Sequence, residues 1–146
     1  MKINPVVHFE MPYEDKDRMA KFYEKTFGWN MQMLGPEMGN YVVAQTSETD
    51  ENSMVTTPGT INGGFYKKTP DPRSHAPSVV IAVDDIREAM EKIKANGGTV
   101  VGGKDGNGEP DEIPGIGLWA SFLDSEGTRV SILQPKSKDY SDHVNN

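Results

Sequence analysis

The stretch SVVIAVDDIREAMEKIKANGG, residues 78–98, has a counterpart seventy positions earlier, HFEMPYEDKDRMAKFYEKTFG, residues 8–28. Laid over each other without a gap, the two align Asp15 with Asp85 and Gly28 with Gly98. Each of the two stretches begins with a short extended run. Acidic residues follow at the expected start of a helix, and that helix ends near a glycine. A repeat of this length indicates one supersecondary unit used twice. Two such units create a shared cleft, where function can lie.

The period of the apolar residues predicts the elements within each copy. In the first copy, alternation over residues 5–12 predicts a strand, and helical spacing over residues 13–27 predicts an amphipathic helix. The second copy repeats both patterns from residue 78, with a helix over residues 85–96. Further strands are expected after each helix, at 29–34, 41–45, 61–67, 99–101, 118–123 and 128–134.

The two modules are expected to form one domain. Module one covers about residues 4–67 and module two about residues 78–135. Three prolines mark residues 68–77 as the linker, and residues 136–146 form a polar tail. Each module reads as strand, helix and three strands, which predicts an α+β fold with eight strands.

Composition limits the classes of function. The net charge is −7 and the basic residues are scattered, which argues against a nucleic-acid partner. No apolar stretch reaches the length of a membrane span, and no signal peptide is recognisable, so we expect a cytoplasmic protein without a membrane partner. The absence of cysteine excludes disulfides, thiolate catalysis and cysteine metal sites.

Three motifs carry a resemblance to a known family. They are FYEKTFGW at 22–29, VVIAVDDIREAMEKIKANGGTVV at 79–101 and DEIPGIGLWASFLDSEGTRVSILQP at 111–135. In this order they resemble the vicinal oxygen chelate superfamily, which includes glyoxalase I, bleomycin-resistance proteins and extradiol dioxygenases, and within it the bacterial branch related to lactoylglutathione lyase. The resemblance implies two βαβββ modules whose mixed sheet curls into a cup, with the helices on its outer face. It also implies a homodimer.

Metalloenzymes of this family hold a divalent metal with four inward side chains. His8 matches the first of these positions, whereas Ser78 and Ser131 stand where a histidine and a glutamate would be. The fourth position falls within residues 61–66, which hold no acid. Three of the four ligands are therefore missing, and we predict no cofactor and no family-type metal site. A rebuilt divalent-metal site made of His8, Glu10 and His75 is the weaker alternative.

Strand alternation predicts which side chains line the cup. We expect a ligand-binding set of five residues, of which the first two are also candidate catalytic residues: His8, Glu10, Ser78, Trp119 and Ser131. The competing interpretation of His8 is a structural histidine whose hydrogen bonds are all made within the sheet. Other aromatic residues are candidates for the same lining or for core packing, namely Trp29, Tyr41, Phe65 and Tyr66.

Residues 104–112, KDGNGEPDE, have the acidic spacing of a calcium loop. The sixth and twelfth positions of that pattern require glycine and glutamate but hold Pro110 and Ile116. We therefore expect a solvated loop there.

The preferred function is a glyoxalase- and bleomycin-resistance-like protein that binds a small molecule between its two modules, with a degenerate metal site. Two alternatives stay open. One is a metal-dependent lyase or dioxygenase with rebuilt ligands, and the other is a non-catalytic interaction module. The sequence does not decide whether the protein is an enzyme.

Overall fold

The computed structural model describes residues 2–136, in which nine strands and two α-helices confirm the α+β fold class. The predicted polar tail lies outside these residues, apart from Lys136, and so does His143. The chain forms two compact units. The N-terminal unit is His8–Pro77, and the C-terminal unit begins at Ser78 and includes the segment before His8.

The N-terminal unit follows the predicted order of strand, helix and three strands. Its elements are β1 (Val6–Tyr13) from His8 onward, α1 (Lys16–Phe27), β2 (Asn30–Met33), β3 (Val42–Gln45) and β4 (Asn62–Lys67), with short 3-10 helices η1 (Pro36–Met38) and η2 (Pro72–His75). The strand order is β2-β3-β4-β1. Strand β1 pairs with β4 in parallel, whereas the other pairs are antiparallel.

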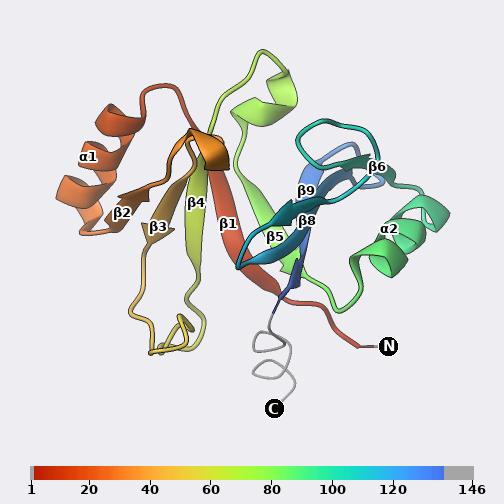
Figure 1. The fold of residues 1–146 in the computed structure, drawn as a ribbon, viewed down its shortest axis with the longest axis horizontal. Coiled ribbons are helices and arrows are strands. Elements are labelled where there is room, and N and C mark those ends of the chain that lie inside the picture. The colour runs from red at the N-terminus through yellow and green to blue at the C-terminus, as the bar shows by residue number, and fades with distance from the viewer. Residues whose placement is uncertain (1, 137–146) are drawn as a thin grey trace. The chain divides into compact units, whose positions relative to one another are not determined.

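Helix α1 begins and ends where the sequence pattern predicts. The Asp15 carboxylate accepts a hydrogen bond from the Arg18 backbone N–H at 3.0 Å, which caps the first turn. Gly28 ends the helix at φ 73°, a left-handed conformation that favours glycine. The helix packs Met19 and Tyr23 onto a core that includes Phe65. Figure 1 shows α1 alongside β2.

The C-terminal unit repeats this plan with one addition. It comprises β5 (Ser78–Ala82), α2 (Ile86–Ala95), β6 (Thr99–Gly102), β7 (Asp111–Ile113), β8 (Gly117–Leu123) and β9 (Arg129–Pro135). The strand order is β5-β9-β8-β6, and β7 pairs with β8. Asp85 caps α2 by accepting from the N–H groups of Arg87 and Glu88, each at 3.1 Å. The core beneath α2, which lies beside β6 in Figure 1, includes Met90, Phe122 and Ile132.

Two features depart from the sequence expectation. The expected solvated loop over residues 104–112 ends in an extra strand, because Asp111–Ile113 turns back at residues 114–116 and pairs with β8. A strand of three residues is too short to show an alternating pattern. The chain before His8 also joins the C-terminal unit, not module one, because the Ala82 N–H donates to the Pro5 carbonyl at 2.9 Å and Lys2 pairs with Asp84 at 2.7 Å.

No helix within residues 2–136 is long and apolar enough to cross a membrane. The expected cytoplasmic location stays a prediction.

Candidate functional site

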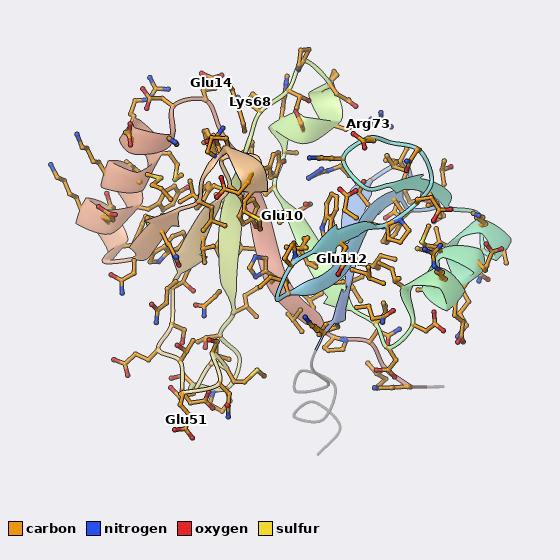
Figure 2. The ribbon with its side chains drawn as sticks, viewed as in Figure 1. Glu10, Glu14, Glu51, Lys68, Arg73 and Glu112 are labelled. Atoms are coloured by element: carbon orange, nitrogen blue, oxygen red, sulfur yellow. The ribbon has the colours of Figure 1, made fainter. Side chains whose placement is uncertain are left out.

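Strand β1 separates an apolar face from a polar one. Phe9, Met11 and Tyr13 pack into the core of the N-terminal unit, together with side chains of α1. Because successive side chains of a strand point to opposite faces, His8 and Glu10 lie on the face away from α1. Glu10, labelled in Figure 2, is only 7% exposed. The sheet therefore buries a carboxylate where the apolar core does not need one.

Tyr41 covers the neighbouring strand on this polar face. In the parallel register, Glu10 is opposite Gly64 of β4. A Cβ atom added at Gly64 would overlap the Tyr41 side chain, and one added at Gly63 would overlap the Phe9 ring. The two adjacent glycines thus let one aromatic ring lie flat on each face of β4. Gly64 occupies the strand on which the resemblance expects an acidic metal ligand, and the Tyr41 ring covers it.

The loop before β3 fixes the place of Tyr41. The Tyr13 hydroxyl donates to the Asn40 carbonyl at 2.7 Å, and the Leu34 N–H donates to the Tyr41 carbonyl at 2.9 Å. Asn40 has φ 56°, a left-handed conformation that asparagine tolerates better than most residues. These contacts hold the start of β3 from both sides and aim the Tyr41 ring across Gly64.

His8, Tyr41 and Glu10 form a hydrogen-bonded chain. The Tyr41 hydroxyl lies 3.3 Å from His8 Nε2 and is hydrogen-bonded to Glu10. A phenol has one hydrogen to donate, and an ionised carboxylate only accepts. Tyr41 therefore donates to Glu10 and accepts from His8, which assigns the proton of the neutral imidazole to Nε2 and leaves Nδ1 as an acceptor.

Burial keeps two groups of this hydrogen-bonded chain, His8 and Tyr41, uncharged. It lowers the pKa of His8 from 6.5 to about 4, so the imidazole is neutral at pH 7. The pKa of Tyr41 is raised well above 10, first by burial and then by the charge and hydrogen bond of Glu10. Both groups therefore stay neutral over the physiological range.

The C-terminal unit also has one face turned away from its helix. Ala120 and Ile132 pair with each other in the core under α2, so the alternate residues of β8 and β9 face the other way. Trp119 and Ser131 are among these alternate residues. Ser131 is fully buried.

Ser78 shares that face with an arginine that sequence reasoning missed. Ser131 pairs with Val80, and Ser78 precedes Val80 by two residues on the same side of β5. Arg129 also alternates with Ser131, and its Nη2 donates to the Ser78 hydroxyl at 3.4 Å. Each unit thus places its predicted ligand residues on its helix-free face. Whether all five line one cavity stays a prediction.

The remaining aromatic candidates divide between core and loop. Phe65 is 1% exposed in the core, and Trp29 stacks on Tyr23 with ring centroids 4.7 Å apart. The Tyr66 hydroxyl donates to the carbonyls of Ser74 and Ala76. Tyr41, by contrast, contacts the predicted site residue His8 through a hydrogen bond. The signal that could have found its position is the Gly63–Gly64 pair, which leaves room above the strand.

The donor groups present do not suit a family-type metal ion. Within residues 2–136, no three side chains of His, Asp or Glu gather as a metal site would require. The rebuilt set is not brought together, because exposed His75 bonds the Thr69 carbonyl at 2.8 Å within its own loop. Gly64 supplies no donor, and a guanidinium lies beside Ser78. Hydroxyl donors beside a positive charge bind divalent metals poorly.

A surface groove beside the start of α1 is separate from this face. Lys68 and Glu14, both labelled in Figure 2, form an ion pair of 3.0 Å there, and Phe22 is exposed nearby. None of the five predicted ligand residues lines this groove.

Comparison with known proteins places this geometry in a family. Residues 6–132 match the model of the Glyoxalase/Bleomycin resistance protein/Dioxygenase superfamily. A glyoxylase-like domain-containing protein of Didymella fabae is 30% identical over 88% of this chain and 92% of its own length. A probable chloroplastic lactoylglutathione lyase of Arabidopsis thaliana is also 30% identical, over 84% of this chain, which spans 33% of that protein.

Solved structures show the same fold at lower identity. Methylmalonyl-CoA epimerase from Mycobacterium tuberculosis superimposes with a TM-score of 0.60 at 12% identity, over 93% of this chain and 91% of the epimerase. Together with the family match over most of the sequence, this confirms the resemblance read from the motifs. The chain belongs to the glyoxalase/bleomycin resistance protein/dioxygenase superfamily.

Proposed function

We propose that this protein binds a small molecule through hydrogen bonds and without metal coordination. The proposed contacts of the N-terminal unit are His8 and Glu10, on the helix-free face of its sheet. Those of the C-terminal unit are Ser78, Trp119 and Ser131, on its own helix-free face. The observation that carries the proposal is the chain of hydrogen bonds through His8, Tyr41 and Glu10.

Burial of these polar groups opposes folding, which favours a role in binding. Removing hydroxyl, imidazole and carboxylate groups from water costs free energy that hydrogen bonds only partly recover. The core of the unit packs on the opposite face and does not use them. The acceptor at His8 Nδ1 suits a ligand that offers O–H or N–H groups. The net charge of −7 favours a neutral or cationic ligand over an anionic one.

Relatives support a small organic ligand. The names of the Arabidopsis lyase and the mycobacterial epimerase denote enzymes that act on lactoylglutathione and methylmalonyl-CoA. Those substrates are not carried over to this chain, and at 12% identity the epimerase shares the fold alone. Binding is favoured over acid–base catalysis by His8, because a general base works best with a pKa near the working pH and that of His8 is about 4.

A ligand screen by thermal shift on the full chain, in buffer with EDTA, tests the proposal. A compound that binds the folded state raises the melting temperature. For any such compound, we expect calorimetry to show about 10- to 100-fold weaker binding to His8→Gln, from a lost contact of about 1–3 kcal/mol. His75→Gln is the matched control and should bind as the wild type does.

Two results would contradict the proposal. One is equal affinity of His8→Gln and the wild type, with the fold intact by circular dichroism. The other is a broad screen without any stabilising compound, which would favour the non-catalytic interaction module instead. The homodimer expected from the family resemblance is also a proposal, to be tested by light scattering against the 16.1 kDa chain mass.

A further inference from the structure

We propose that the Tyr41 hydroxyl takes the place of the metal ion in the N-terminal unit, by joining His8 to Glu10 as a metal ion would. The inference explains how the fold accommodates the missing ligands. It does not depend on the proposed small-molecule ligand, because it concerns only groups within the chain.

The Tyr41 hydroxyl contacts both His8 and Glu10. His8 and Glu10 are alternate residues on one face of β1, so a group that contacts both must lie above that face. The Tyr41 oxygen is within 3.3 Å of His8 Nε2 and shares a hydrogen bond with Glu10. A metal ion bound to the same two side chains would lie about 2.0–2.2 Å from each donor atom. Tyr41 thus fills the space between the two donors.

The single side chain of Tyr41 removes two requirements of a metal site, the space for the ion and a further acidic donor. The Tyr41 ring covers Gly64, so any side chain on that residue would overlap it. The same tyrosine therefore lies between His8 and Glu10 and excludes a further acidic donor from the strand next to His8. The glycine and the tyrosine form a matched pair, and neither is explained by packing of the core on the opposite face.

The Tyr41 hydroxyl also matches the hydrogen-bonding capacity of its two neighbours, His8 and Glu10. A neutral imidazole that donates from Nε2 needs an acceptor, and a carboxylate needs a donor. A hydroxyl group supplies one of each without adding charge. A divalent ion would have to displace this hydroxyl and the ring that carries it.

The test reverses the replacement. In a double variant, Tyr41→Ala with Gly64→Glu, the space is opened and a third donor is added beside His8 and Glu10. We expect calorimetric titration with Zn²⁺ to give one site per chain, at least 100-fold tighter than any binding by the wild type. Adding His8→Ala to the double variant should abolish this site, whereas adding His75→Ala should leave it unchanged.

Several outcomes decide the inference. A folded double variant that gains no Zn²⁺ site would overturn it, and so would wild-type protein that binds one Zn²⁺ per chain until His8→Ala removes it. If the double variant does not fold, Tyr41→Phe decides, since it keeps the ring and removes only the oxygen. In ¹⁵N spectra of histidine, Tyr41→Phe should then show a mixture of both neutral His8 tautomers. An unchanged single tautomer would refute the role of the hydroxyl. A negative ligand screen would leave these results unaffected.

Discussion

Acid should destabilise this protein through His8. The folded state holds the pKa of His8 at about 4, whereas an unfolded chain has a value near 6.5. Between these values the unfolded state binds a proton that the folded state does not bind. The free energy of unfolding therefore falls as the pH falls from about 6.5 towards 4. The contribution of His8 to the free energy of unfolding is fully present above about pH 6.5, and it is lost as the pH falls to about 4.

The size of the effect follows from the two pKa values. The full loss is about 3 kcal/mol, at about 1.4 kcal/mol for each pH unit between them. At pH 5, where carboxylates still contribute little, about 2 kcal/mol should already be lost. This is a large fraction of the roughly 5–15 kcal/mol by which domains are usually stable.

Urea unfolding at pH 8 and pH 5 measures this loss directly. We expect the wild type to lose about 2 kcal/mol between the two pH values through His8. His8→Gln should be less stable than the wild type at pH 8, by about 1 kcal/mol for the lost hydrogen bond to Tyr41. The free energy of unfolding of His8→Gln should not show the loss of about 2 kcal/mol between pH 8 and pH 5 that His8 causes, whereas His75→Gln should still show it. If the free energy of unfolding of His8→Gln falls as much as that of the wild type between pH 8 and pH 5, His8 is not buried as a neutral imidazole.

Two further substitutions test the packing that positions the site. Gly64→Ala should destabilise the protein by about 1–3 kcal/mol in urea unfolding, because the added methyl group overlaps Tyr41, and the double variant with Tyr41→Ala should recover part of the loss. An unaltered unfolding midpoint in Gly64→Ala would show that the ring does not lie on this strand. Asp85→Ala should cost about 1 kcal/mol, because two N–H groups at the start of α2 lose their acceptor. A loss as large as that of a core residue would mean that Asp85 does more than cap the helix.

The repeated elements were predictable because their signals are local. Asp15 and Asp85 precede regular apolar periods, and both cap helices as expected. The side chains of β1 and β9 that lie in the cores are those that strand alternation assigns to the apolar face, since a period of two needs only the residues within one strand. The family resemblance then added the expectation that the mixed sheet curls.

The parts that sequence reasoning missed depend on contacts between distant segments. Tyr41 reaches His8 only because Gly64 leaves room on β4, and no local pattern joins these three residues. Arg129 meets Ser78 across two paired strands. Strand β7 was missed because three residues carry no period, and pairing with β8 defines it. The absence of an acid from residues 61–66 was visible in the sequence, but the Tyr41 ring that covers Gly64 was not.

Histidine ¹⁵N NMR of the wild-type protein at pH 7 tests most directly whether His8, Tyr41 and Glu10 form the hydrogen-bonded chain. His8→Gln assigns the His8 signals among the three histidines. The structure predicts a neutral His8 imidazole with its proton on Nε2, unchanged by EDTA. A doubly protonated ring, a proton on Nδ1, or a shift that EDTA reverses would contradict the account.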